Sequence, residues 1–318
     1  MTVVVFSHWF DPTADHVVAE LNRREIPVFR CDGADFPQRL TMTATLDGTW
    51  TGTLRNATRT VELREVSGIL YRRPTDFEFP EGMPDQVRRW SAQEARIGFG
   101  GLLASLDSWL NHPHHIAFAE YKPVQLQAAA RAGLDVPRTL IANSPDAARS
   151  FCEDVGQVIY KPFGAGGITD NGEAKLIYAT RIPPGDFGHP GVALTACLFQ
   201  EWVEHDYAVR AAAIDGRIFA SAIHAGSPAA HTDWRSDYDS LHYEPAEIPP
   251  DVARGVRSLM ASLRLRFGVL DFLVRPDGSY VYLEINPNGQ WAWIDDLAKT
   301  TASAIADALM KGPPDDLG

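Results

Sequence analysis

Long apolar runs are missing from this chain of 318 residues. It has no stretch of about 18 apolar residues, so no transmembrane helix is expected. The first apolar stretch, residues 3–6, is too short for the hydrophobic region of a signal peptide, and no basic segment precedes it. We therefore expect no membrane partner, and we interpret residues 3–6 as a buried first strand.

Cysteine and positive charge are also scarce. The three cysteines, Cys31, Cys152 and Cys197, are odd in number and too widely spaced for a zinc pattern. This usage predicts a cytoplasmic, reducing location. Basic residues number 29 against 41 acidic ones, which gives a formal net charge of −12. That surplus argues against a nucleic-acid or anionic-membrane binder, although it leaves room for a local phosphate site.

The residues that are present indicate a soluble enzyme with a real core. The chain is 45% hydrophobic and 22% charged, and its length suggests roughly two domains or one domain with several lobes. Periodicity predicts an α/β class. The expected strands are 3–6, 28–30, 40–46, 53–56, 60–63, 68–71, 138–142, 158–161, 175–180, 197–203, 208–214, 217–223, 267–274 and 280–285. The expected helices are 13–24, 84–106 with an interruption at 98–101, 121–132, 144–152, 250–264 and 294–310.

Composition shifts to Asn, Pro and His at residues 111–115, where we place a domain boundary. We predict an N-terminal α/β domain over 1–115, a central lobe over 116–200 and a C-terminal lobe over 201–318. His112, His114 and His115 tempt a metal interpretation. No Cys or acidic partner stands nearby at ligand spacing, so we expect this cluster to be a loop.

Two lysines are candidate phosphate ligands. Lys122 stands before Pro123, and Lys161 ends an apolar strand that runs into the glycine-rich residues 164–167. A lysine at such a place can hold a phosphate oxygen while loop amides fold over a polyphosphate. Each could equally be a surface lysine, and the glycines a plain turn. The chain has no Walker A motif, so this is not a P-loop.

A third feature is an apolar strand that ends in carboxylates, Phe199-Gln200-Glu201-Trp202-Val203-Glu204-His205-Asp206. Such a segment can present backbone groups to an adenine edge and a carboxylate to ribose hydroxyls. A strand end with solvated acids is the alternative.

A fourth feature gathers oxygen donors. Glu284 and Asn286 are two residues apart on a strand, so both side chains face the same side. Asp271 lies on the strand across the Asp277-Gly278 turn, so all three can converge on one place. Hard oxygen donors suit Mg²⁺. Solvated surface acids are the alternative, but Glu284 lies among apolar neighbours, where an unpaired charge is costly.

Two arginines and two tryptophans complete the candidates. Arg210 follows the carboxylate-ended segment and could steady an acyl phosphate or a tetrahedral anion. Arg235 lies in a polar loop and could meet a substrate carboxylate or face solvent. Trp291 and Trp293 follow the strand of Glu284, so we expect them beside the reacting carboxylate; packing in the core is the alternative.

The order of these features resembles the ATP-grasp superfamily over essentially the whole chain. Several segments resemble more specifically the maturases of graspetides, ribosomal peptides of the microviridin kind. These segments are Tyr71-Arg72-Arg73-Pro74, Trp109-Leu110-Asn111, Glu120-Tyr121-Lys122-Pro123-Val124-Gln125-Leu126, Val136-Pro137-Arg138-Thr139-Leu140-Ile141 and Leu283-Glu284-Ile285-Asn286-Pro287-Asn288-Gly289-Gln290-Trp291.

The resemblance implies an N-terminal pre-grasp domain followed by two lobes that bind ATP between them. By position, Lys122 and Lys161 would be the nucleotide lysines. The segment Glu201, Trp202 and Val203 would be the adenine hinge. Asp206 would bind ribose, with Glu204 as a competitor. Asp271, Glu284 and Asn286 would bind Mg²⁺, and Arg210 would lie by the phosphate.

The activity that this resemblance implies is an ATP-dependent peptide macrocyclase. It would activate Asp or Glu side chains of a ribosomal precursor peptide, leader plus core, as acyl phosphates. A Ser or Thr hydroxyl or a Lys amine would then attack. Rival interpretations are a ligase that joins free amino acids or adds glutamate to a protein C-terminus, and a nucleotide-binding scaffold without catalysis. The sequence identifies no general base and leaves ester or amide product, ring size, leader contacts and a homodimer open.

Overall fold

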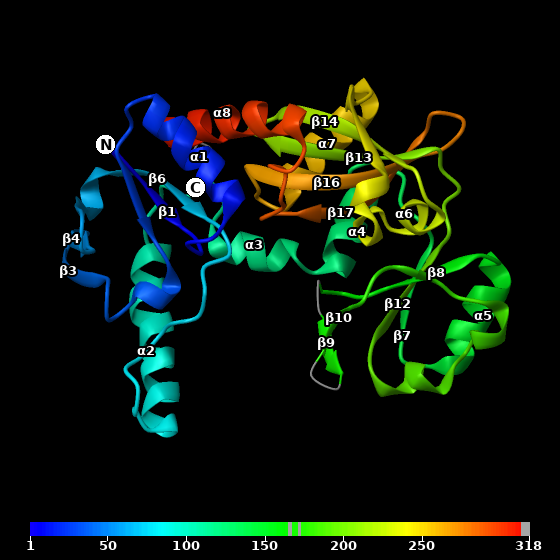
Figure 1. Cartoon of the computed structure of the whole chain (residues 1–318), viewed down its shortest axis with the longest axis horizontal. Coiled ribbons are helices and arrows are strands. Elements are labelled where there is room, and N and C mark those ends of the chain that lie inside the picture. Colours follow the sequence, from blue (N-terminus) through cyan, green and yellow to red (C-terminus); the bar gives the residue numbers. More distant parts are fainter. Residues whose placement is uncertain (165–166, 171–172, 313–318) are drawn as a thin grey trace.

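The computed structural model describes residues 1–164, 167–170 and 173–312. It is an elongated α/β molecule with a parallel sheet at one end and a lobe of helices and antiparallel strands at the other. A five-stranded antiparallel sheet lies between and above them (Figure 1). Among these residues, no helix combines the length and the apolar character needed to cross a membrane.

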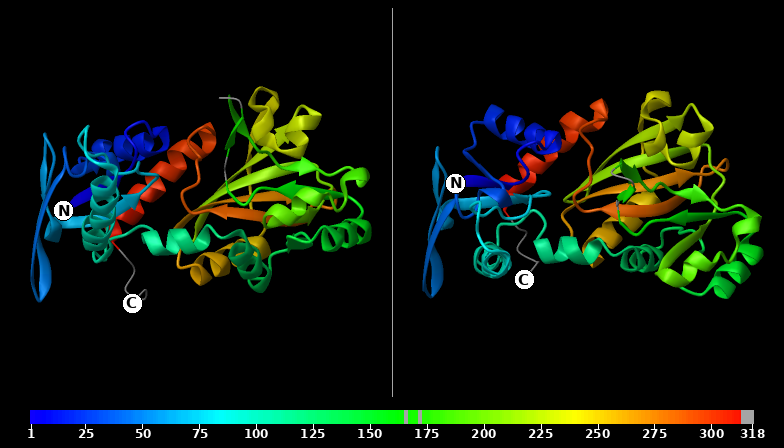
Figure 2. Two further views of the ribbon diagram at one scale, coloured as in Figure 1. Left: turned by 90° about the horizontal axis from the view of Figure 1, so that it is seen from below. Right: turned by 60° about the horizontal axis from the view of Figure 1, so that its bottom comes forward.

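The N-terminal region contains two small sheets. The parallel one has the order β2-β1-β6, and the antiparallel one has the order β3-β4-β5. The elements are β1 (Thr2–Phe6), α1 (Pro12–Arg23), β2 (Val28–Cys31), β3 (Thr41–Asp47), β4 (Thr49–Arg55), β5 (Thr60–Glu62), β6 (Val66–Tyr71), α2 (Asp85–Ala104) and α3 (Pro113–Ala119). Figure 2 shows β3 and β4 standing at the far end of this region.

Two predictions for this region are wrong. Helix α2 is continuous through Gly98, Gly100 and Gly101, although an interruption was expected. A Cβ atom at any of these glycines would meet nothing within 4 Å, so they occupy open helix surface rather than a break. The histidine cluster is not a loop: the ring of His112 caps α3 by accepting from the His114 amide at 3.2 Å.

The central lobe has a four-stranded sheet of order β11-β8-β12-β7 and a separate β9-β10 hairpin. Its elements are α4 (Lys122–Arg131), β7 (Thr139–Ala142), α5 (Pro145–Val155), β8 (Val158–Lys161), β9 (Gly167–Asp170), β10 (Glu173–Leu176), β11 (Thr180–Arg181) and β12 (Cys197–Glu201). Helix α4 leads into it. The single strand predicted over 175–180 is instead divided between β10 and β11. Ser144 caps α5 as predicted, because its hydroxyl accepts from the Ala147 amide.

The C-terminal lobe is built on the sheet β15-β14-β13-β16-β17. Its elements are β13 (Tyr207–Ile214), β14 (Arg217–Ala225), α6 (Pro228–Thr232), β15 (Leu241–Ala246), α7 (Pro250–Ser262), β16 (Phe267–Val274), β17 (Tyr280–Asn286) and α8 (Asp295–Lys311). The predicted β13–β14 hairpin is confirmed. Its turn residues Asp215 and Gly216 have φ of 44° and 80°, the left-handed backbone that a two-residue hairpin turn requires.

Short 3₁₀ turns join several of these elements. They are Gly33–Asp35, Leu63–Glu65, Pro184–Asp186, Pro190–Leu194, Trp234–Ser236 and Tyr238–Ser240.

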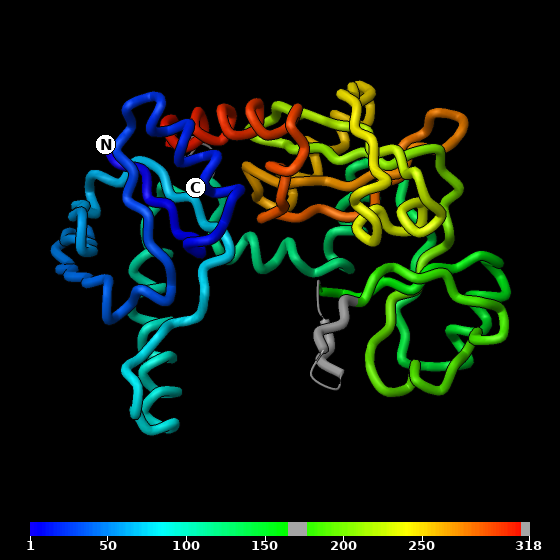
Figure 3. Tube along the Cα trace, in the orientation of Figure 1, coloured from blue at the N-terminus to red at the C-terminus, as the bar shows by residue number. Residues whose placement is uncertain are grey.

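The C-terminal helix packs against the N-terminal domain. Figure 3 shows α8 (red) returning to lie beside α1 (blue). Buried side chains from both ends form one core, in which Val3 and Leu70 share a cluster with Phe267 and Ile305. Burial of such apolar surface stabilises the fold by about 25 cal/mol per Å². The bounds 1–115, 116–200 and 201–318 stay a prediction; helix α8, at the C-terminal end, packs against α1 and β6 as well as against β13 and β14.

The segments that carried the resemblance include anchors between these regions. Asn111 donates from Nδ2 to the Phe267 carbonyl at 2.7 Å, and its Oδ1 accepts from the amides of Arg266 and Phe267. Nδ2 also donates to the Pro287 carbonyl at 3.3 Å, so this buried amide contacts both the start of β16 and the segment after β17. The N-terminal domain is thereby held at a fixed place on the five-stranded sheet.

Candidate active site

Three neighbouring strands bring four predicted site residues together on one face of the five-stranded sheet. Arg210 on β13 lies opposite Asp271 on β16, which lies opposite Glu284 on β17. Arg210 Nη1 donates to Asp271 Oδ1 at 2.7 Å. Asn286 Nδ2 donates to Glu284 Oε1 at 3.2 Å, so these two side chains share a side, as strand alternation requires. We call these four residues the carboxylate cluster.

Cations surround Glu284, whose side chain is largely buried. Its Oε2 accepts from the Lys122 ammonium, and its Oε1 accepts from Arg235 Nη1 at 3.4 Å. Burial alone would raise the pKa of Glu284, but the charges of Lys122, Arg235 and Lys161 outweigh it and hold that pKa well below its usual range. The carboxylate is therefore ionised at neutral pH.

Lys122 reaches this place because α4 is tied to the edge of the sheet. Gln125 donates from Nε2 to the Ile285 carbonyl at 2.8 Å, and its Oε1 accepts from the Ile285 amide at 3.2 Å. Lys122 is the first residue of α4, so this pair of bonds sets its position against β17. Gln125 is not among the predicted site residues. Its spacing could have predicted this role, because Gln125 stands three residues after Lys122 and lies on the buried face of α4.

Asp271 is buried and only half satisfied. Its Oδ1 accepts from Arg210, while Oδ2 is buried without a hydrogen-bond partner in the described part of the chain. Arg210 is itself held by Nε and Nη2, which donate to the Gln290 carbonyl at 2.9 and 2.6 Å. Burial raises the pKa of Asp271, and the Arg210 charge opposes this. A buried oxygen left without a partner costs about 1–3 kcal/mol, so this atom suits an added cation.

Lys161 is the last residue of β8, and it lies close enough to Glu284 for that charge to act on it. Burial lowers the pKa of this lysine to about 8, while the Glu284 charge acts in the opposite direction. The side chain is still mainly the ammonium at pH 7, as a phosphate ligand must be. Residues 165 and 166 of the predicted glycine loop lie outside the described residues.

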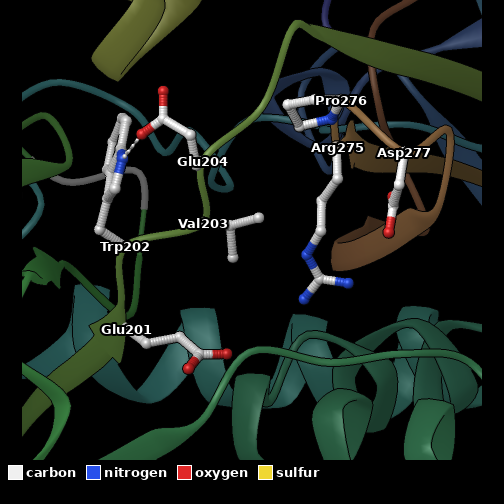
Figure 4. Close-up of a pocket in the computed structure, with 7 residues that line it drawn as sticks. All are labelled: Glu201, Trp202, Val203, Glu204, Arg275, Pro276 and Asp277. Atoms are coloured by element: carbon white, nitrogen blue, oxygen red, sulfur yellow. Dashed lines mark hydrogen bonds between the residues drawn. The ribbon is translucent and has the colours of Figure 1, made fainter.

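The predicted hinge lies beside a cavity of about 360 Å³. Its lining residues are Glu201, Trp202, Val203, Glu204, Arg275, Pro276 and Asp277. Figure 4 shows Val203 pointing into the space between the hinge and Arg275. Glu201 Oε1 accepts from the Arg138 amide at 3.0 Å, and Trp202 Nε1 donates to Glu204 at 3.0 Å. Asp206 is exposed and is not part of this lining.

Arg235 is bonded to the carboxylate cluster, although its side chain is 44% exposed. Besides its bond to Glu284, its Nε donates to Asp233 Oδ1 at 2.9 Å. Burial would lower the pKa of Arg235, but the charges of Glu284 and Asp233 outweigh burial and hold that pKa above its usual range. The carboxylate of Asp233, which sequence analysis passed over, is thus part of the same network.

An aromatic group flanks these arginines. The rings of Trp234 and Trp293 stack with centroids 5.1 Å apart, and Tyr238 lies edge-on to both. The Arg210 guanidinium lies 5.4 Å from the Trp234 centroid. The expectation for Trp291 is wrong: it is fully buried in the core beside α8, whereas Trp293 lies at the site.

Similarities to known proteins agree with this arrangement. The family model described as the MvdD pre-ATP grasp domain matches residues 2–117. The chain is similar to a solved RiPP-associated ATP-grasp ligase of Chryseobacterium gregarium in complex with ADP and a leader and core peptide. The TM-score is 0.91 at 24% identity, over 98% of this chain and 97% of that one.

Two further solved structures are similar. Macrocyclase MdnC of Microcystis aeruginosa MRC, bound with precursor peptide MdnA, has a TM-score of 0.84 at 27% identity, over 97% of this chain and 99% of that one. ATP-grasp ligase PsnB, complexed with a minimal precursor, Mg and ADP, has a TM-score of 0.76 at 23% identity, over 97% of each. No curated protein matches by sequence. The prediction of an ATP-grasp fold with a pre-grasp domain is confirmed.

Proposed function

We propose, from an ATP-grasp ligase fold shared over almost the whole chain with a peptide macrocyclase, that this protein is an ATP-dependent macrocyclase of a ribosomal precursor peptide. The observation that carries the proposal is the carboxylate cluster with Lys122, Lys161 and Arg235 around it. Phosphoryl transfer to a carboxylate needs this combination of oxygen donors and cations, because negative charge gathers on both reactants.

The cluster fits Mg²⁺. Asp271 offers a buried oxygen that has no hydrogen-bond partner among the residues that the structure describes, Glu284 is ionised, and Asn286 can offer its amide oxygen. In the described residues no three His, Cys, Asp or Glu side chains gather as a metal site, so the donor set is two carboxylates and one amide. When bound, magnesium would neutralise and orient the phosphates of ATP. These three residues would hold it.

The reaction that we propose has two steps. The γ-phosphoryl group of ATP passes to a carboxylate oxygen of an Asp or Glu side chain, which gives an acyl phosphate and ADP. A Ser or Thr hydroxyl or a Lys amine of the same peptide then attacks the acyl carbon and releases phosphate. Lys122 and Lys161 would hold the nucleotide phosphates, and Arg235 the reacting carboxylate. Arg210 would keep Asp271 in place and offset charge.

The nucleotide base would lie at the hinge. Backbone groups of Glu201, Trp202 and Val203 would meet the adenine edge, and an exposed carboxylate would meet the ribose. We keep Asp206 for that role, with Glu204 as the competitor that lines the hinge cavity. The three-domain division at 1–115, 116–200 and 201–318 is part of the same proposal.

The peptide would lie along the aromatic group. Trp234, Trp293 and Tyr238 offer flat surface beside Arg210 and Arg235, so a chain held there would bring its acidic side chain to the cations. The partner is a leader plus core peptide, and no nucleic acid or membrane is needed. A cytoplasmic location completes the proposal, and the three free, buried cysteines agree with a reducing compartment.

Mass spectrometry of a co-expressed precursor peptide tests this function. We expect products that lose one water, about 18 Da, for each ring closed, because every ester or amide bond between side chains removes one water. Fragmentation should locate crosslinks between acidic and hydroxyl or amine side chains. A product whose mass rises by whole residues would instead support a ligase for free amino acids, and nucleotide binding without any product would support a scaffold.

A second prediction concerns Lys161. Its replacement by alanine removes a half-buried positive charge that faces Glu284, so we expect ATP affinity or the rate of phosphoryl transfer to fall about 100-fold. Calorimetry with ATP and single-turnover rates would measure the two effects. Lys299→Ala, on the exposed side of α8, is the control. If both quantities equal those of the control, Lys161 has no part in nucleotide binding.

A further inference from the structure

One buried carboxylate joins the two lobes at the site. Asp233 lies between α6 and the turn Trp234–Ser236, and it is 7% exposed. Its Oδ2 accepts from the Ala179 amide of the central lobe at 3.1 Å. Its Oδ1 accepts from Arg235 twice, from the backbone amide at 3.1 Å and from Nε at 2.9 Å. A single side chain thus contacts both lobes.

Ala179 lies beside Lys161, the lysine that we propose holds a nucleotide phosphate. It immediately precedes β11, whose first residue Thr180 pairs with Tyr160 in antiparallel register. One step further along the same register lies Lys161. The Asp233 charge also acts on Lys161 directly, since it favours the charged ammonium. The amide that Asp233 holds is therefore part of the backbone that positions Lys161.

Arg235 carries the link to the other side. With Nε fixed by Asp233, its Nη1 reaches Glu284 at 3.4 Å. The path runs from the strand beside Lys161 through Asp233 and Arg235 to the carboxylate cluster. Charge-assisted bonds of this kind are stronger than neutral ones, and they order a flexible arginine. The position of Lys161 is therefore linked to the position of Arg235.

We propose that Asp233 is a positioning residue that sets Arg235 and the central-lobe strand of Ala179 at their working separation. This inference rests on the proposed function, because it assigns the effect of Asp233 to the same phosphoryl transfer. A helix-ending aspartate that only caps a turn would stabilise its loop. It would not need the bond to Ala179, which is 54 residues away along the chain.

Two substitutions separate the two contacts. Asp233→Ala removes both of them. Asp233→Asn keeps a carbonyl oxygen for the Ala179 amide but removes the charge that holds Arg235. We expect kcat to fall about 10- to 100-fold in both variants, the range found when groups that orient a working side chain are removed. The KM for ATP should change by less than about threefold.

Hydrogen exchange supplies a measurement that does not depend on turnover. The Ala179 amide should lose protection in Asp233→Ala and keep it in Asp233→Asn. Asp237→Asn is the matched control, because Asp237 is in the same loop but accepts from the Ser227 hydroxyl within its own lobe. It should leave both kcat and Ala179 protection as in the unaltered protein.

The background of Arg235→Ala tests whether Asp233 acts through Arg235. Removing the Asp233 charge should cost little further there, because coupled residues are not additive. Full additivity, or an unchanged kcat in both single variants, would overturn the inference. If the unaltered protein dehydrates no precursor peptide, the proposed function is wrong instead. In that event the exchange of the Ala179 amide would still test whether Asp233 holds the two lobes.

Discussion

Replacement of Glu284 by glutamine is expected to abolish most ATP-dependent turnover, by roughly a thousandfold or more. The glutamine would keep the shape of the side chain but lose the charge that faces Lys122, Arg235 and Lys161. Two carboxylates and an amide form the proposed donor set, so one neutral replacement halves its formal charge. Asn286→Ala, which removes the neighbouring amide, should act in the same direction.

ADP release and peptide dehydration, measured in the same sample, would show the loss. Glu284→Gln also leaves cations without their partner, so thermal unfolding and circular dichroism must show that the variant is folded. Glu244→Gln is the matched control, because Glu244 is exposed on β15 of the same sheet. A folded Glu284→Gln protein with near-normal turnover would remove the carboxylate cluster from the proposed reaction.

This cluster is the part of the site that sequence could predict. Strand alternation puts Glu284 and Asn286 on one side, and an Asp-Gly turn pairs their strand with the strand of Asp271. Both rules are local, so they act within a hairpin and need no knowledge of the whole fold. The observed register, with Asp271 opposite Glu284, also needs the β-bulge between Asp271 and Phe272, which neither rule contains.

Contacts between distant segments were beyond those rules. The bond of Asp233 to Ala179 and the pair of bonds from Gln125 to Ile285 depend on how lobes and helices dock. A periodicity argument does not contain that information. The same holds for Trp291: its place two residues before Trp293 suggested a shared surface. In the structure the chain turns there, and one ring enters the core while the other lies at the site.

The prediction of a break at the glycines of α2 is wrong for a different reason. Gly98, Gly100 and Gly101 lower helix propensity by about 1 kcal/mol each relative to alanine, which predicted a break. Helix α2 continues because Phe99, Leu102 and Leu103 bury their side chains in the N-terminal core and offset that cost. Propensity is weak beside tertiary packing, and it fails where buried residues flank the weak positions.

The largest effect on stability is expected from Arg72→Ala. Arg72 is 1% exposed, and its Nε donates to Asp11 at 2.9 Å. Its Nη1 donates to the carbonyls of Asn288 and Gly289 at 3.0 Å each, so one guanidinium joins the N-terminal domain to the loop after β17. Asp11 also caps α1. Alanine would leave a buried carboxylate and two carbonyls without this donor.

Breaking a buried ion pair by removing one partner costs about 3–5 kcal/mol, because the remaining charge stays in a poor solvent. We therefore expect the free energy of unfolding of Arg72→Ala, from chemical denaturation followed by circular dichroism, to fall by that amount. Arg138→Ala is the comparison, since its pair with Asp154 is exposed and should contribute at most about 1 kcal/mol. Equal losses in the two variants would mean that Arg72 does not hold the domains together. A large loss for Arg72 alone would give the first arginine of Tyr71-Arg72-Arg73-Pro74 a structural role. Its guanidinium is bound by Asp11 and by the carbonyls of the loop that leads to α8.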